Sequence, residues 1–205
     1  KKQIDSNISK VLRHSKFILG PEVYELEGRL QDYTGAKYCI TCANGTDALE
    51  LSLRALNIGY GDEVITVSHT AVPTVAAIES CGASPVLVDI DEDQYTMNVS
   101  HLKDALSSKT KAVIAVHIYG NSCDLFKIRK IANKKKIILI EDNCESLGSK
   151  LKDKHLGTFG DFGTFSFFYS HQITSGEGGM VTCNNPKDYE ILFSLRSHGW
   201  LGGLM

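Results

Sequence analysis

One histidine has polar and glycine neighbours that would suit a side chain acting as a base. His171 belongs to the segment 163–179, GTFSFFYSHQITSGEGG, with Ser166 before it and Glu177 and two glycines after it. An imidazole exchanges protons readily near neutral pH, because its ordinary pKa is about 6.5. A lone histidine is more often structural than catalytic. The polar and glycine residues on either side of His171, together with an acid upstream, favour the catalytic interpretation.

A second segment has the features of an anion site. Asn44, Gly45 and Thr46 follow an apolar run and open an amphipathic stretch. The first turn of a helix has free N–H groups and the positive end of the helix dipole, which suit a phosphate. An ordinary helix cap by Thr46 or Asp47 explains the same residues and is the simpler interpretation of this motif alone.

Acidic residues follow the apolar run 137–140 directly. We therefore expect Asp142 at the carboxyl end of a central strand, where it could bind a metal ion, a ribose or a pyridinium nitrogen, or cap a loop. A carboxylate beside a pyridinium keeps the ring protonated and able to accept electrons. Glu145 is either a solvent-facing acid or a further residue of the same site.

Short β-rich runs alternate with helical stretches along the chain. The β-rich runs are 38–41, 63–67, 85–89, 112–116 and 137–141, and the helical stretches include 46–56, 74–81 and 125–133. This alternation is typical of an α/β fold with a mostly parallel sheet covered by helices. Ligands of such sheets bind at the carboxyl ends of the strands, where the candidate residues fall. Without a linker, residues 1–205 are predicted to form one domain, with a helical segment at 1–20.

Composition narrows the function classes. The 205 residues are 42% hydrophobic and carry a formal net charge of −2, which argues against a nucleic-acid-binding face. The apolar runs are too short to span a bilayer or to form a signal core, so we expect a cytoplasmic protein. Six cysteines at irregular spacing favour small buried residues over a zinc or redox site, and no metal site is predicted.

The segment around His171 resembles the DegT/DnrJ/EryC1/StrS family of sugar aminotransferases and dehydratases. The Ser-Phe pair at 166–167, His171 and the Glu-Gly-Gly at 177–179 keep the family spacing, with Asp142 about thirty residues upstream. The family usually has a lysine at the position of His171, where it forms a Schiff base with the cofactor. Histidine cannot form that bond. This replacement resembles the GDP-4-keto-6-deoxymannose 3-dehydratase subgroup, which removes the C3 hydroxyl.

The resemblance implies a fold and a cofactor. The fold is the large domain of a fold type I (aspartate aminotransferase-like) transferase, without the small C-terminal domain that family members have. The cofactor is pyridoxal 5′-phosphate (PLP) or pyridoxamine 5′-phosphate (PMP). By resemblance, Gly45, Thr46 and Ser166 bind its phosphate, Asp142 its ring nitrogen, and Glu145 lies near its phenolic oxygen.

One position departs from the family. An aromatic residue commonly stacks on the cofactor ring where this chain has Ala71. His69 could supply part of that face, or be an ordinary loop histidine with its hydrogen bonds satisfied. The segment 117–120, His-Ile-Tyr-Gly, is expected to shape the pocket wall.

The resemblance also implies an activity. The predicted enzyme acts on a nucleotide-linked 4-keto-6-deoxy sugar, removes its C3 hydroxyl with His171 as base, and uses glutamate to restore the amine form of the cofactor. A homodimer in the biosynthesis of deoxysugars for cell-surface polysaccharide, such as lipopolysaccharide O-antigen, is expected. Two alternatives remain open: a nucleotide-sugar aminotransferase, and a non-catalytic relative.

Overall fold

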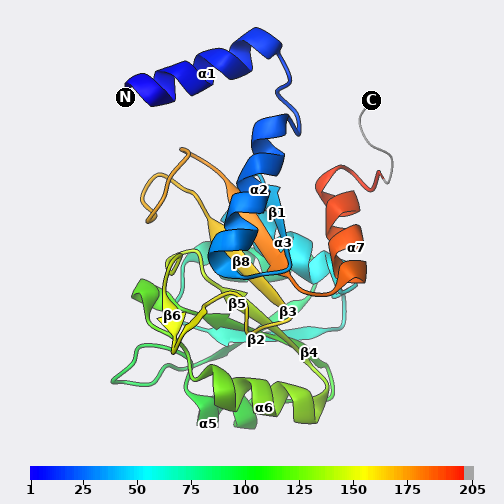
Figure 1. The fold of residues 1–205 in the computed structure, drawn as a ribbon. Coiled ribbons are helices and arrows are strands. Elements are labelled where there is room, and N and C mark those ends of the chain that lie inside the picture. Colours follow the sequence, from blue (N-terminus) through cyan, green and yellow to red (C-terminus); the bar gives the residue numbers. More distant parts are fainter. Residues whose placement is uncertain (201–205) are drawn as a thin grey trace.

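The alternating pattern folds into a seven-stranded sheet in a computed structural model that describes residues 1–200 (Figure 1). The strands, in their order across the sheet, are β1 (Tyr38–Cys42), β9 (Gly179–Cys183), β8 (Phe162–Ser166), β5 (Ile138–Asp142), β4 (Thr110–Val116), β2 (Glu63–Val67) and β3 (Ser84–Val88). A separate two-stranded ribbon is formed by β6 (Lys150–Leu151) and β7 (Lys154–His155).

Strand direction confirms the predicted mostly parallel sheet. The neighbours β3, β2, β4, β5 and β8 pair in parallel. Strand β9 pairs antiparallel with both β8 and β1, so β9 runs against the other six strands. The five predicted β-rich runs are all strands of this sheet. Strands β8 and β9 flank the His171 segment and were not predicted as strands.

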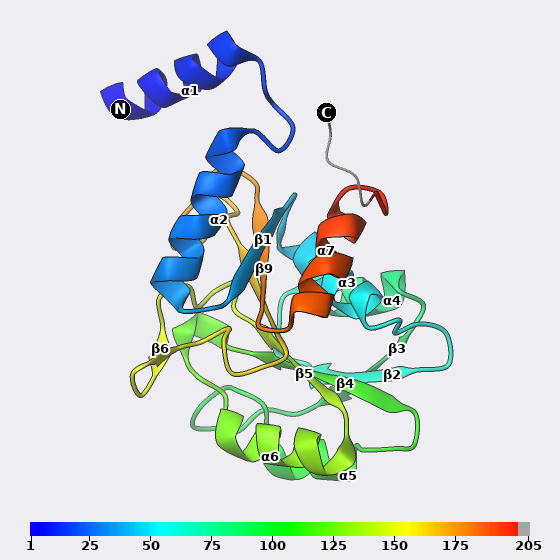
Figure 2. The same cartoon turned by 45° about the vertical axis from the view of Figure 1, so that its right-hand side comes forward.

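Helices cover the sheet on both faces. The helices are α1 (Lys2–His14), α2 (Pro21–Thr34), α3 (Gly45–Ala55), α4 (Val72–Ser80), α5 (Val99–Asp104), α6 (Leu125–Lys135) and α7 (Pro186–Arg196), with a 3₁₀ turn, η1 (Ile118–Gly120). Helices α3, α4 and α7 lie on one face, and α5 and α6 lie together on the other (Figure 2). Between these layers the central strands are almost wholly buried, as in β4, where Ala112, Val113, Ile114 and Ala115 are 0% exposed. Burial on both faces explains why these strands are continuous apolar runs.

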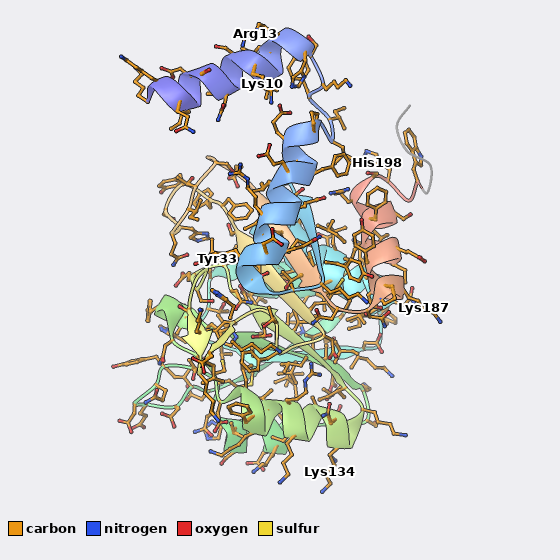
Figure 3. All side chains as sticks on the ribbon, in the orientation of Figure 1. Lys10, Arg13, Tyr33, Lys134, Lys187 and His198 are labelled. Carbon is orange, nitrogen blue, oxygen red and sulfur yellow. The ribbon has the colours of Figure 1, made fainter. Side chains whose placement is uncertain are left out.

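Helix α1 extends away from this body (Figure 1). None of its residues is buried, and two ion pairs link it to α2. Glu22 at the start of α2 accepts from His14 Nε2 at 3.1 Å and lies 3.2 Å from Lys10 Nζ; Figure 3 shows Lys10 on α1. Within the predicted helical segment 1–20, residues 2–14 are helical. No helix of residues 1–200 is long and apolar enough to cross a membrane.

Candidate active site

The predicted site residues come together at the carboxyl edge of the sheet. A cavity of about 500 Å³ opens there, above the ends of β4, β5 and β8 and the first turns of α3 and α4. Its lining includes Asn44, Gly45, Thr46, Thr70, Ala71, Thr74, His117, Ile118, Asp142, Cys144, Glu145, Ser166, Phe168, Ser170, His171 and Glu177. Of the site residues predicted from the sequence, only His69 is outside this set.

The first turn of α3 forms one end of the cavity. Asn44, rather than Thr46 or Asp47, caps this helix: its Oδ1 accepts the Asp47 N–H at 2.8 Å. The N–H groups of Gly45 and Thr46 then have no partner among residues 1–200. A Cβ at Gly45 would come within 2.7 Å of Ser166 Cβ and 2.9 Å of Cys144 Sγ. Glycine therefore lets the helix start lie directly against β8. Both residues with free N–H groups line the cavity, as an anion site requires.

Asp142 ends β5 beneath the cavity and is 5% exposed. Its Oδ2 accepts from Thr74 Oγ1 at 2.9 Å, and its Oδ1 accepts the Cys144 N–H at 3.2 Å. Thr74 is in turn 2.8 Å from Thr70 Oγ1. These bonds fix the direction of a nearly buried carboxylate, which suits it to hold a cationic ring N–H.

A buried pair lies directly behind Asp142. Glu141 and His117 are fully buried, with His117 Nε2 3.1 Å from Glu141 Oε2. The Cys123 N–H donates to His117 Nδ1 at 3.1 Å, so the imidazole proton must be on Nε2. Glu141 also accepts backbone N–H groups from residues 157, 159 and 160 at 2.9, 2.7 and 2.5 Å. The pair therefore ties β4, β5 and the segment before β8 together.

Glu145 and the His171 segment are tied to each other across the cavity. Glu145 Oε2 accepts the Tyr119 N–H at 3.3 Å, and its backbone oxygen accepts from Gln172 Nε2 at 2.6 Å. The second bond holds the residue next to His171 against the loop that follows β5. Glu145 is thus oriented by the protein and is not a free solvent-facing acid.

His171 lies on the connection between β8 and β9. Its backbone N–H donates to Phe168 O at 3.0 Å, and the ring of Phe168 meets its imidazole edge-on, with centroids 5.9 Å apart. Its Nδ1 is buried and has no hydrogen-bond partner within residues 1–200. A buried nitrogen without a partner is rare and points to a missing ligand. No lysine is among the described residues that line the cavity.

His69 and Ala71 follow β2 and differ in position. Ala71 lines the cavity as the family alignment predicts, but it offers no ring face. His69 points its Nε2 to Tyr119 Oη at 3.1 Å and lies outside the lining residues. The predicted contact of His69 with the cofactor ring thus stays a prediction, and its neighbours in the structure are tyrosines.

Two thiols lie close to the cavity in surroundings that disfavour the thiolate form. Burial raises the pKa of Cys42 to about 12, and burial beside Asp142 raises the pKa of Cys144 well above its ordinary value. No disulfide occurs among the six cysteines, which all lie within residues 1–200. Small buried residues were expected at most of these positions, and three of the six are fully buried.

Comparison with known proteins decides the family. The profile of the DegT/DnrJ/EryC1/StrS aminotransferase family matches residues 1–203. This chain belongs to that family. The expected fold is confirmed as well, since a DegT/DnrJ/EryC1/StrS aminotransferase from Brucella abortus has a TM-score of 0.94 over 97% of the chain at 36% identity. The match covers 55% of the length of the Brucella abortus protein.

Curated relatives within the family act on nucleotide sugars. The UDP-2-acetamido-2-deoxy-3-oxo-D-glucuronate aminotransferase of Pseudomonas aeruginosa is 44% identical over 97% of the chain and 56% of its own length. The GDP-perosamine synthase of Escherichia coli O157:H7 is 41% identical over 88% of the chain and 50% of its own length. The chain thus spans about half the length of these relatives. Their names support the aminotransferase alternative better than the expected 3-dehydratase.

The dehydratase appears among the structural neighbours. The E. coli GDP-4-keto-6-deoxy-D-mannose-3-dehydratase, solved with bound hydrated PLP, has a TM-score of 0.88 at 36% identity over 94% of the chain and 51% of its own length. NtdA from Bacillus subtilis, solved with bound PMP, has a TM-score of 0.89 at 31% identity over 94% of the chain and 44% of its own length. The expected PLP or PMP cofactor is therefore confirmed for the family.

Sequence reasoning missed two parts of the site. It placed Glu141 at the end of the predicted strand 137–141 but assigned it no role, although Glu141 is the last strand residue but one and is completely buried. The signal was present: an acid inside an apolar strand needs buried partners. It also left Tyr95 out and named Tyr119 only as part of the segment 117–120, and no local sequence signal reveals that the two tyrosines flank His69.

Proposed function

We propose that this chain is the cofactor-binding part of a PLP/PMP-dependent enzyme that removes the C3 hydroxyl from a nucleotide-linked 4-keto-6-deoxy sugar. The observation that carries the proposal is the side chain at position 171. A cavity suited to the cofactor has a histidine with an unpartnered buried nitrogen there, and no lysine among its described lining residues. Such a site offers a base without a competing amine.

The residues present fit the cofactor. The N–H groups of Gly45 and Thr46 have no partner within residues 1–200, and both residues line the cavity, which matches a phosphate beside a helix start. Ser166 lies against Gly45 and is proposed as a further phosphate contact. Asp142, held by two donors, is proposed to bind the ring nitrogen, and Glu145 to lie near the phenolic oxygen.

The proposed role of each residue follows from its position in the cavity. When bound, the cofactor supplies an amine that condenses with the sugar ketone and a ring that accepts electrons. Asp142 keeps the ring nitrogen protonated. His171 moves the proton whose removal allows the C3 hydroxyl to depart. The bond from Gln172 to Glu145 keeps the His171 segment over the cavity while this happens.

A solved relative supports the reading of position 171. One structure of ColD is a variant in which a histidine is replaced by lysine and the serine directly before it by asparagine, and it has a TM-score of 0.93 at 33% identity. Another structure names ColD as GDP-4-keto-6-deoxymannose-3-dehydratase. The same serine-histidine order occurs here as Ser170 and His171.

Amino transfer to a nucleotide sugar is the second candidate, because the curated relatives named above are aminotransferases. The two reactions differ in product. The intact protein is incubated with cofactor, glutamate and a nucleotide-linked 4-keto-6-deoxy sugar, and the product is analysed by mass spectrometry. Loss of one sugar oxygen supports dehydration, whereas replacement of the keto oxygen by an amino group establishes amino transfer and refutes dehydration.

Two substitutions test the role of His171 directly. His171→Asn should abolish deoxygenation and leave cofactor binding intact; unchanged turnover refutes the role. His171→Lys should allow covalent trapping of PLP by borohydride, read as a mass increase on a peptide containing position 171. The control is His101→Asn at an exposed position of helix α5, which should change neither readout.

The proposal extends to the whole protein. Residues 1–205 are proposed as the large domain, completed by a smaller C-terminal domain, in a cytoplasmic homodimer that uses glutamate as amino donor. Size-exclusion chromatography with light scattering on the intact protein tests the dimer, and a monomer at working concentration contradicts it.

A further inference from the structure

Two tyrosines and a histidine form an exposed aromatic face beside the cavity. His69 lies between Tyr95 and Tyr119, with ring centroids 6.3 and 5.8 Å away. Tyr95 is 53% exposed and Tyr119 is 71% exposed. These three residues follow β2, β3 and β4, which are neighbours in the sheet. The aromatic face, as we call these three residues, therefore lies on the ligand-binding edge of the sheet.

The backbone at both tyrosines is strained. Tyr95 has φ 59° and Tyr119 has φ 58°, in the left-handed region that bulky residues rarely adopt. Strain of this kind costs stability and tends to occur at ligand sites. It serves here to present two phenol rings outward, on either side of one imidazole.

The surrounding bonds hold these conformations in place. Tyr95 N–H donates to Asp91 O at 2.8 Å, within a turn that the Asp91 side chain also closes. Asn121 Nδ2 donates to Gln94 O at 2.7 Å and so joins the turn of Tyr95 to the segment of Tyr119. The Tyr119 N–H bonds Glu145, which lines the cavity. The aromatic face is thus rigid and continuous with the cavity wall.

We infer that the aromatic face is the binding subsite for the nucleobase of the nucleotide sugar. This inference rests on the proposed function. A substrate whose sugar reaches His171 inside the cavity leaves its nucleotide outside. The aromatic face lies at the same edge of the sheet as the cavity and is joined to its wall by the bond from Tyr119 N–H to Glu145. Planar bases stack on exposed aromatic rings, and the Tyr119 hydroxyl and the His69 ring add polar groups at the edge.

The test is calorimetric titration of the intact, cofactor-loaded protein with UDP, GDP, dTDP and inorganic pyrophosphate. At least one nucleoside diphosphate should bind more tightly than pyrophosphate. Tyr119→Ala and Tyr95→Ala should each weaken that nucleotide about 10-fold and leave pyrophosphate unchanged. Tyr119→Phe, which keeps the ring, should retain most of the affinity.

Controls separate stacking from loss of fold. Tyr119→Gly removes the ring and also the backbone strain, so it should weaken the nucleotide without lowering the melting temperature. Tyr60→Ala, at a tyrosine that is 99% exposed in another loop, should have no effect. Equal binding of nucleotides and pyrophosphate, or unchanged affinity in the alanine variants, overturns the inference. So does a change of oligomeric state with unchanged nucleotide affinity, because it assigns the face to a protein contact.

The proposed subsite and the proposed reaction can be refuted independently of each other. The nucleotide-binding pattern above, found together with a product that is not deoxygenated, supports the subsite and refutes the proposed reaction. A deoxygenated product from alanine variants with wild-type KM and nucleotide affinity refutes the subsite alone.

Discussion

Removing the buried acid behind the site should destabilise the whole domain. Glu141 is 0% exposed, and each of its oxygens accepts two N–H groups: Oε1 from Phe159 and Gly160, and Oε2 from His117 and Gly157. Glu141→Gln keeps one acceptor oxygen and replaces the other by an NH₂ group, which faces two donors. Two buried donors therefore lose their acceptor.

The expected loss in the free energy of unfolding follows from the number of buried donors that lose their acceptor. A buried donor without a partner costs about 1–3 kcal/mol, so the substitution should lower the free energy of unfolding by about 2–6 kcal/mol. His117 cannot compensate by moving its proton to Nδ1, because that atom accepts the Cys123 N–H at 3.1 Å. A domain of ordinary stability, about 5–15 kcal/mol, would lose a large part of it.

Urea unfolding followed by far-UV circular dichroism measures this loss. The matched control is Glu50→Gln, which breaks a surface pair with Arg54 at 2.7 Å and should cost about 0.5 kcal/mol or less. A loss below about 1 kcal/mol for Glu141→Gln, at an unchanged denaturant slope, would refute the reasoning, since two unsatisfied buried donors cost more than that.

Three further predictions concern glycine, thiols and acid. Gly45→Ala should lower the free energy of unfolding by about 1–3 kcal/mol and abolish PLP binding, because its Cβ would overlap Ser166. The control Gly28→Ala, with open space around its Cβ, should leave stability unchanged or raise it. Thermal melts and cofactor titration compare the two variants. Cys42, whose pKa burial raises to about 12, should resist iodoacetamide at pH 8 in the folded protein and react after unfolding; rapid labelling of the native protein would contradict this. The His14 side chain lowers the pKa of Glu22 from 4.5 to about 2. The contact between α1 and α2 should therefore be complete above pH 4.5 and weaken as the pH falls towards 2. Hydrogen exchange in α1 should become faster over this pH range in the wild type, and Glu22→Gln should not show this pH dependence.

The sheet could be predicted because its strands are buried on both faces. Runs such as 63–67 and 112–116 are apolar without alternation, and helical stretches separate them, so their type follows from local pattern. Strands β8 and β9 were not predicted from the sequence, because β8 contains Gly163 and β9 begins at Gly179. Each glycine permits a close backbone approach, which only the folded chain shows.

The sequence predicted residues that the structure brings together in one cavity, but it did not predict the bonds between them. Gly45, Asp142, Ser166 and His171 are far apart in sequence, and the strand-end rule alone gathers them at one edge of the sheet. The partners of Glu141 come from a loop whose course no local pattern fixes. The left-handed backbone of Tyr119 has no sequence signal, since glycine or asparagine is the usual marker of that conformation.

The isolation of the His171 side chain bears on how new activities arise in such proteins. Its imidazole forms no hydrogen bond within residues 1–200, and its loop is held by backbone contacts and by Gln172. An exchange of histidine and lysine there would remove no structural bond, and the ColD variant described above keeps the fold with a lysine in place of a histidine. If the proposed role of His171 holds, a change of residue at this position changes the reaction without removing a hydrogen bond of residues 1–200.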